Sequence, residues 1–158
     1  MKEKLLWLFI LIVLMFYYFS TKEHSIPVYG ESMYPTIKNG DTISYKTYYL
    51  GDLPKNSIVL FETKDGDLNI KRVIGVAGDK VIIRDNDIFL NDELFFDSKI
   101  SPGDTYISNK EILIKEDEIF VLGDNLSKSV DSRNYGCVKL SNVIGIYTGK
   151  VWGKVTLN

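Results

Sequence analysis

The sequence has few of the side chains that form metal sites and cross-links. Its 158 residues include one cysteine, Cys137, and one histidine, His24. A single cysteine excludes an intramolecular disulfide, and the two residues together leave too few ligands for a structural zinc site. A Ser-His-Asp site would have to use His24, which we interpret as a solvated residue between Glu23 and Ser25. We therefore expect neither a metal nor another cofactor.

The chain also has no large excess of positive or negative charge. The formal net charge is −2, and lysines and arginines are scattered among acidic residues without a basic run. This pattern argues against nucleic acid as a partner. The length suits one domain with one core, and no low-complexity segment or linker divides the chain.

Residues 5–19, LLWLFILIVLMFYYF, form the longest apolar run and contain no charged residue. A span needs about 20 residues, so this run is short. The neighbouring Ser20 and Thr21 and flanking lysines that extend toward the lipid headgroups would narrow the gap. A core helix would normally be amphipathic. A cleavable signal would need small residues at positions −3 and −1, and YYFSTKEHSIPVYG offers no such pair.

The favoured interpretation is therefore an uncleaved anchor. Residues 1–21 are expected to form a cytoplasmic N-terminus and a single transmembrane helix, because the lysines near the start predict a cytoplasmic N-terminus. Residues 22–158 would then form an extracytoplasmic domain. A lone cysteine is compatible with that compartment.

After the anchor, short β-branched and aromatic runs alternate with turn residues. The predicted strands cover residues 42–45, 57–61, 70–76, 80–84, 88–90, 118–122 and 143–151. Residues 85–87 are predicted to form a hairpin turn, and residues 92–117 a small excursion. The expected fold is mainly β, a compact antiparallel barrel or sandwich behind one helix.

Three polar motifs contain the candidate residues for a chemical function. They are G-E-S-M-Y-P-T at residues 30–36, N-I-K-R-V-I-G-V-A-G-D at 69–79 and G-D-N-L-S-K-S-V-D-S-R at 123–133. Alone, each has an ordinary explanation: a turn serine, a solvated lysine and a polar surface loop. A functional alternative exists for Lys71, which shares a strand face with Val73. Burial would lower its pKa, and a neutral amine can take a proton from a serine hydroxyl.

Together and in this order, behind one anchor, the three motifs resemble those of the type I signal peptidases. The resemblance covers roughly residues 26–152. The compact spacing is similar to the smaller Gram-positive forms, without the large inserted β domain of the Gram-negative forms. The resemblance implies a membrane-bound serine endopeptidase that removes N-terminal signal peptides from exported preproteins, in a bacterial plasma membrane.

The resemblance also implies roles for individual residues. Ser32 would be the nucleophile and Lys71 the general base, a known variant of triad chemistry. Ser129 would orient the lysine amine, and the Ser32 backbone N–H would be an oxyanion donor. Some members have a serine two residues before the nucleophile as a second donor. Here that residue is Gly30, so a second donor would come from elsewhere, or the oxyanion hole would rely on the backbone alone.

The last motif is expected to brace the site. Asp131 and Arg133 match residues that form an ion pair there, and Arg72 is expected to join their network. Asp124 and Asn125 are interpreted as structural.

The substrate would be an extended preprotein segment bound by strand addition, with small side chains in shallow apolar pockets. Four apolar residues flank the motifs and are either pocket or ordinary core residues: Val28, Met33, Ile37 and Ile70. We also expect Met33, Tyr34 and Pro35 to lie against the bilayer, which would help to desolvate Lys71.

Two alternatives stay open. One is a conjugative or pilin-type maturation peptidase with the same Ser-Lys pair. The other is a tethered, non-catalytic β domain that binds peptides. A self-cleaving repressor lacks support, because no DNA-binding segment is present. The expected partners are signal peptides and the lipid bilayer, with no obligatory protein partner.

Overall fold

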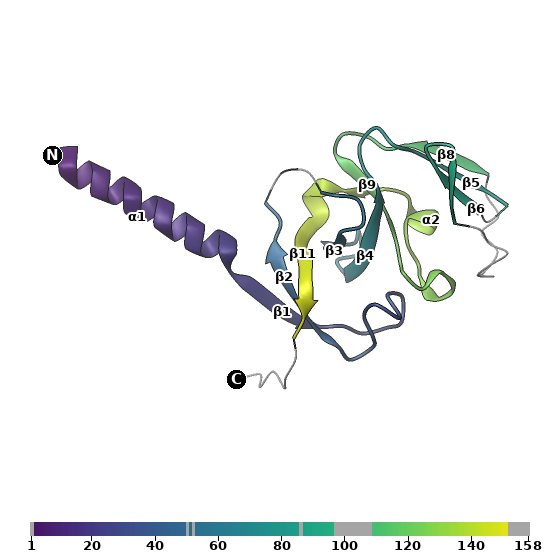
Figure 1. The fold of residues 1–158 in the computed structure, drawn as a ribbon, viewed down its shortest axis with the longest axis horizontal. Coiled ribbons are helices and arrows are strands. Elements are labelled where there is room, and N and C mark those ends of the chain that lie inside the picture. Colours follow the sequence, from purple (N-terminus) through teal and green to yellow (C-terminus); the bar gives the residue numbers. More distant parts are fainter. Residues whose placement is uncertain (1, 50, 52, 86, 97–108, 152–158) are drawn as a thin grey trace.

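The computed structural model describes residues 2–49, 51, 53–85, 87–96 and 109–151 (Figure 1). The chain begins with helix α1 (Lys2–Thr21), and a mainly β domain follows. The strands are β1 (Glu23–Pro27), β2 (Thr42–Thr47), β3 (Ile58–Glu62), β4 (Leu68–Gly75), β5 (Lys80–Arg84), β6 (Asp87–Leu90), β7 (Glu93–Phe96), β8 (Lys110–Leu113), β9 (Glu118–Leu122), β10 (Val138–Lys139) and β11 (Val143–Lys150). The short helices are η1 (Leu126–Lys128), α2 (Ser132–Tyr135) and η2 (Leu140–Asn142).

The strands form two antiparallel sheets. The larger has the order β1-β2-β11-β3-β4-β9-β10, and the smaller has the order β7-β6-β5-β8. The smaller sheet lies at the end of the domain far from α1 (Figure 1). Among the described residues β1 and β10 are the edges of the larger sheet and do not pair with each other. The prediction of antiparallel β structure is confirmed, and these strands form two open sheets without barrel closure.

Each of the seven predicted strands is present, but the described residues contain four more that were missed: β1, β7, β8 and β10. Residues 92–117 are more than an excursion, because they hold β7 and β8, the outer strands of the smaller sheet. Residues 97–108 of this segment lie outside the described residues. The predicted hairpin is confirmed, since β5 and β6 pair down to Arg84 and Asp87. Asn86 at its turn is not described.

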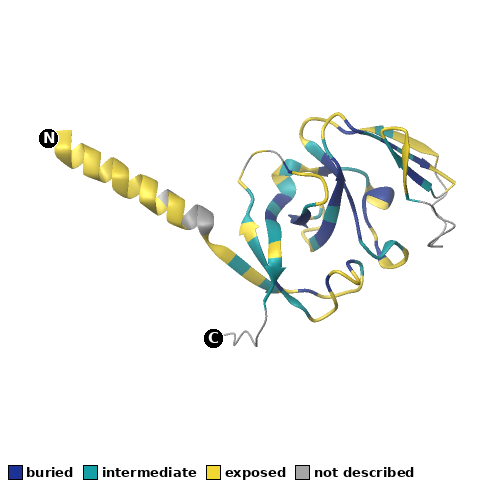
Figure 2. Ribbon diagram, viewed as in Figure 1, coloured by how far each residue is buried: buried dark blue, intermediate teal, exposed yellow. Residues whose placement is uncertain are grey.

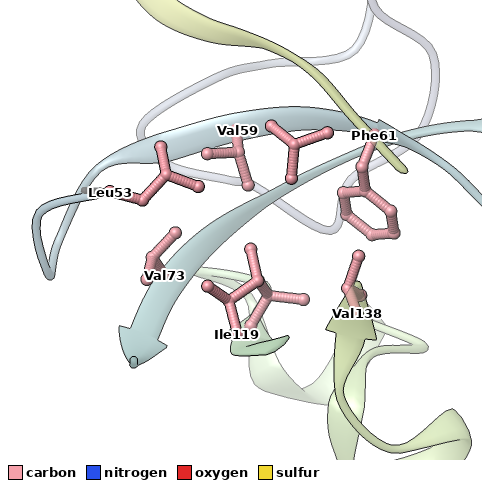
Figure 3. Packing of buried hydrophobic residues seen from close by; sticks show 8 residues of the cluster. Leu53, Val59, Phe61, Val73, Ile119 and Val138 are labelled. Carbon is pink, nitrogen blue, oxygen red and sulfur yellow. The ribbon is translucent and has the colours of Figure 1, made fainter. Parts of the chain in front are cut away.

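In the described part of the chain, the buried side chains form three groups. One lies between β3, β4 and β9 and includes Val59, Phe61, Val73 and Val121 (Figure 3). The second joins the smaller sheet to the larger one through Phe120 and Leu122 on β9. The third packs residues 28–37 against β3 and β4. This third group fixes the first motif onto the strand that carries Lys71.

Helix α1 stands apart from the rest of the domain (Figure 2). Its described apolar side chains are exposed along its length, for example Leu5 at 70%, Trp7 at 69% and Tyr17 at 66%. Only Lys22 separates its last residue from the first residue of β1. Within the described residues, no helix is both long enough and apolar enough to cross a membrane.

Candidate active site

The first and second motifs meet through one short contact. Ser32 lies in the loop between β1 and β2, and Lys71 lies in the middle of β4. The Lys71 Nζ atom lies 2.9 Å from the Ser32 Oγ atom and donates a second hydrogen bond, of 3.1 Å, to the Ile70 carbonyl. Residues 39 positions apart in the sequence are thus brought to the distance at which a proton can pass between them.

The environment of Lys71 favours its neutral form. The side chain is only 3% exposed, and desolvation by burial lowers its pKa below the ordinary 10.5. The negative charge of Asp131 acts in the opposite direction and raises the pKa. The folded domain therefore desolvates Lys71 by itself. A neutral amine here can accept the Ser32 hydroxyl proton and leave an oxygen nucleophile.

Gly123 lies where the first and third motifs come into contact. A Cβ atom at this position would lie 2.5 Å from both the Ser129 Cβ atom and the Ser32 carbonyl oxygen. Only glycine fits between them without displacing one side. The Asn125 N–H also donates to the Ser32 carbonyl at 2.9 Å. Ser129 is 3% exposed and lies next to Gly123; its role toward Lys71 stays a prediction.

Asp131 and Arg133 form the ion pair that the sequence predicted. The Asp131 side chain is fully buried. Its Oδ1 accepts from Arg133 Nε at 2.8 Å, and its Oδ2 accepts from Arg133 Nη2 at 2.9 Å and from the Gly123 N–H at 3.1 Å. Arg133 also donates to the carbonyls of Leu126 and Ser129 at 2.8 and 3.1 Å. This pair fixes the loop that carries Ser129.

Arg72 lies in a different network from the one expected. Its guanidinium donates two hydrogen bonds of 2.7 Å to the carboxylate of Asp124, and a third to the Asn56 carbonyl. The Thr36 hydroxyl donates to the same carboxylate at 2.5 Å. Asp124 thus joins the Ser32 loop to β4. Thr36 is the last residue of the first motif. It was not predicted as a site residue, because the sequence does not show which residue its hydroxyl contacts.

The four candidate pocket residues pack together in the third core group. Met33 and Ile37 are 2% and 0% exposed, while Val28 and Ile70 keep 8% and 7% of their surfaces exposed. The expectation that Met33 lies against a bilayer is wrong, since this side chain faces the core. Tyr34 beside it is 52% exposed. The two neighbouring residues of this turn therefore differ sharply in burial.

The remaining candidates lie away from the Ser32–Lys71 pair. His24 is on β1, where its ring stacks on Tyr45 with a centroid distance of 5.5 Å. Cys137 is half-buried, and burial raises its pKa to about 11, which disfavours a reactive thiolate. In the part of the chain that the structure describes, no cluster of His, Cys, Asp and Glu side chains could hold a metal ion.

Comparison with known proteins gives one consistent result. The model of a peptidase family, described as "Signal peptidase, peptidase S26", matches residues 1–152. Signal peptidase IB of Staphylococcus aureus is 32% identical, over 96% of this chain and 91% of that protein. The chloroplastic thylakoidal processing peptidase 1 of Arabidopsis thaliana is 30% identical, over 81% of this chain and 41% of that protein.

A solved structure supports the same relationship. The crystal structure of a signal peptidase I from Enterococcus faecalis is similar, with a TM-score of 0.50 and 26% sequence identity. The similarity covers 63% of this chain and 100% of that one. The sequence and the fold are therefore both similar to those of signal peptidases.

Proposed function

This chain belongs to the S26 family of signal peptidases, and we propose that it removes signal peptides from exported preproteins, with Ser32 as nucleophile and Lys71 as general base. The observation that carries this proposal is the 2.9 Å contact between the Ser32 hydroxyl and the buried Lys71 amine. A lysine held in a non-polar site beside a serine is the arrangement that a Ser-Lys peptidase requires.

The reaction follows from this geometry. Ser32 Oγ attacks the carbonyl carbon of the scissile bond while its proton passes to Lys71 Nζ. The Ser32 backbone N–H stabilises the oxyanion that forms. The protonated amine then gives its proton to the leaving nitrogen, and an ester remains on Ser32. Lys71, neutral again, activates the water that hydrolyses this ester.

The surrounding residues serve as positioning groups in this scheme. Ser129 is proposed to orient the lysine amine. The Asp131–Arg133 pair fixes the Ser129 loop, and Arg72 acts through Asp124 and Thr36 on the Ser32 loop. The fixed positions matter because a displacement of about 1 Å at a reacting atom can cost about 100-fold in rate.

For the substrate, we propose an extended segment with small residues at the two positions that face the apolar group beside Ser32. Val28 and Ile70 are the better candidates for pocket walls, because they keep some surface exposed. Met33 and Ile37 support them from the core. Shallow walls of this kind accept alanine and reject larger side chains by overlap.

We also propose that α1 attaches the domain to the plasma membrane of a bacterium, with the N-terminus on the cytoplasmic side. Supporting this, the described apolar side chains are exposed along the helix, Lys2 and Lys4 lie in its first turn, and Lys22 follows its end. A surface of this kind is unfavourable in water and favourable in lipid. Extraction of membranes with alkaline carbonate tests the attachment: the protein should stay in the pellet.

The reaction is tested with a preprotein that has an Ala-x-Ala site, in detergent or lipid near pH 8. Wild type, Ser32→Ala and Lys71→Ala are compared with Ser141→Ala and Lys64→Ala, which alter exposed residues outside the site. Wild type and both controls should cut after the second alanine, and both site variants should lose several orders of magnitude in kcat/KM. Cleavage that survives Lys71→Ala would refute the general-base assignment.

The same assay separates the alternatives. If wild type cuts a pilin precursor but none of several unrelated preproteins, the maturation-peptidase function applies. If it binds such peptides and cuts none of them, the chain is a non-catalytic peptide-binding domain.

A further inference from the structure

We propose that β1 is a rigid spacer between the membrane helix and the nucleophile, and that it selects which peptide bond of a membrane-embedded preprotein is cut. This inference rests on the proposed function and on the attachment of α1 to the bilayer. It assigns a specificity-determining role to a strand that holds none of the catalytic groups.

The connection between the helix and the sheet is only one residue long. Helix α1 ends at Thr21 and β1 begins at Glu23, so Lys22 is the only residue between them. Each of the five residues of β1 then pairs with a residue of β2. Figure 1 shows β1 leading away from the helix in roughly the same direction as the helix itself. A strand held along its whole length cannot change its length without losing its hydrogen bonds.

Side chains add to the backbone pairing. The His24 ring stacks on Tyr45 at 5.5 Å, the hydroxyls of Ser25 and Ser44 lie 3.4 Å apart, and Ile26 packs against the third core group. These contacts favour one register over its alternatives, because a shift by one residue would reverse the two faces of the strand.

The chain stays fixed beyond the end of β1. The Val28 N–H donates to the Asp41 carbonyl, and the Val28 carbonyl accepts from the Gly40 N–H, both at 2.8 Å. The Gly30 N–H donates to the Asn39 side chain at 3.0 Å. The chain is thus held by hydrogen bonds from the end of the helix to Gly30, two residues before Ser32. The nucleophile cannot move toward or away from α1 independently.

The length of β1 gives the expected spacing. Five strand residues at about 3.3 Å each span about 17 Å. An extended substrate would cover the same distance with about five residues. The preferred bond should therefore lie about five residues or more beyond the end of the substrate's apolar segment, and bonds closer to the bilayer should be cut poorly.

The test uses the full-length protein in proteoliposomes and a series of preproteins whose single Ala-x-Ala site is moved stepwise away from the apolar segment. One variant has Gly-Ser-Gly-Ser inserted between Lys22 and Glu23. A control variant has the same insertion between Asp65 and Gly66, in the exposed turn between β3 and β4. A short soluble peptide with the same site reports whether each variant is folded and active.

Wild type and the control should cut a narrow range of spacings. Four flexible residues add about 11 Å of reach, or about three residues of extended substrate. The junction variant should therefore extend the range outward by about three residues, while cutting the soluble peptide at the wild-type rate. In detergent, where no bilayer fixes α1, the proteins should cut all spacings alike.

Two results would overturn the spacer role: the same range for wild type and the junction variant, or equal cutting of every spacing by wild type in the bilayer. If wild type fails to cut even the soluble peptide, the proposed function is refuted, and the spacer role with it. Loss of soluble-peptide cleavage in the junction variant alone would show that β1 contributes to the active structure itself, which also contradicts a pure spacer.

Discussion

Replacing Lys71 by methionine tests the buried lysine in two ways. Methionine has a similar length and no charge, so Lys71→Met removes the amine and the cost of burying its ammonium form together. Without a general base, kcat/KM should fall by about 100-fold to 10,000-fold. The more specific prediction concerns stability, because burial lowers the pKa of Lys71 in the folded state only.

The sign follows from proton linkage. Between the lowered pKa of folded Lys71 and the ordinary 10.5, the unfolded chain holds a proton that the folded chain has released. The free energy of unfolding of wild type therefore rises with pH in this window, by up to about 1.4 kcal/mol per pH unit. The variant lacks this dependence. Toward pH 10.5, wild type should be the more stable by about 1 to 3 kcal/mol, because the variant loses the hydrogen bonds to Ser32 and Ile70. Toward lower pH this advantage should shrink.

The assay is urea denaturation in detergent micelles, followed by circular dichroism at several pH values. The quantity of interest is the difference in unfolding free energy between wild type and Lys71→Met, in which the other titrating groups largely cancel. Lys64→Met, in an exposed turn, shows the effect of losing a lysine without burial. A difference that stays constant from neutral pH to 10.5 would refute the claim that burial depresses the pKa of Lys71.

Three further predictions concern the groups around this pair. Gly123→Ala places a Cβ 2.5 Å from the Ser32 carbonyl oxygen, so kcat should fall at least about tenfold and stability by about 1 to 3 kcal/mol; Gly149→Ala, with nothing within 4 Å, should change neither. Arg133→Lys cannot keep the two side-chain hydrogen bonds to Asp131, so the unfolding free energy in a urea titration should fall by about 1 to 3 kcal/mol. Unchanged stability would show that these two hydrogen bonds are dispensable. Asp131→Asn removes the charge that raises the pKa of Lys71, so the acid limb of the kcat/KM profile should move to lower pH, and a shift to higher pH would contradict the sign.

Much of the fold follows from local pattern. The strands from Ile58 to Glu62 and from Glu118 to Leu122 are apolar runs between turn residues, and both are present where the sequence predicted strands. The missed strands have weaker local signals. In β1, Glu23 to Pro27 contains charged and polar residues and ends in proline, and it is a strand because β2 pairs with it at the edge of the sheet.

In the site, too, some features follow from the sequence and others only from the tertiary structure. The resemblance that the three motifs carry implied that Ser32 and Lys71 would meet, and the structure brings these two residues together. The sequence could not assign Arg72 to Asp124, nor show that Met33 faces the core, because both depend on how the Ser32 loop packs on β4. Motifs alone fix the chemical groups, whereas distances and burial between residues far apart in the chain arise only when the sheets pack. The lowering of the Lys71 pKa is of this second kind, because desolvation is a property of the packed environment and not of the residue.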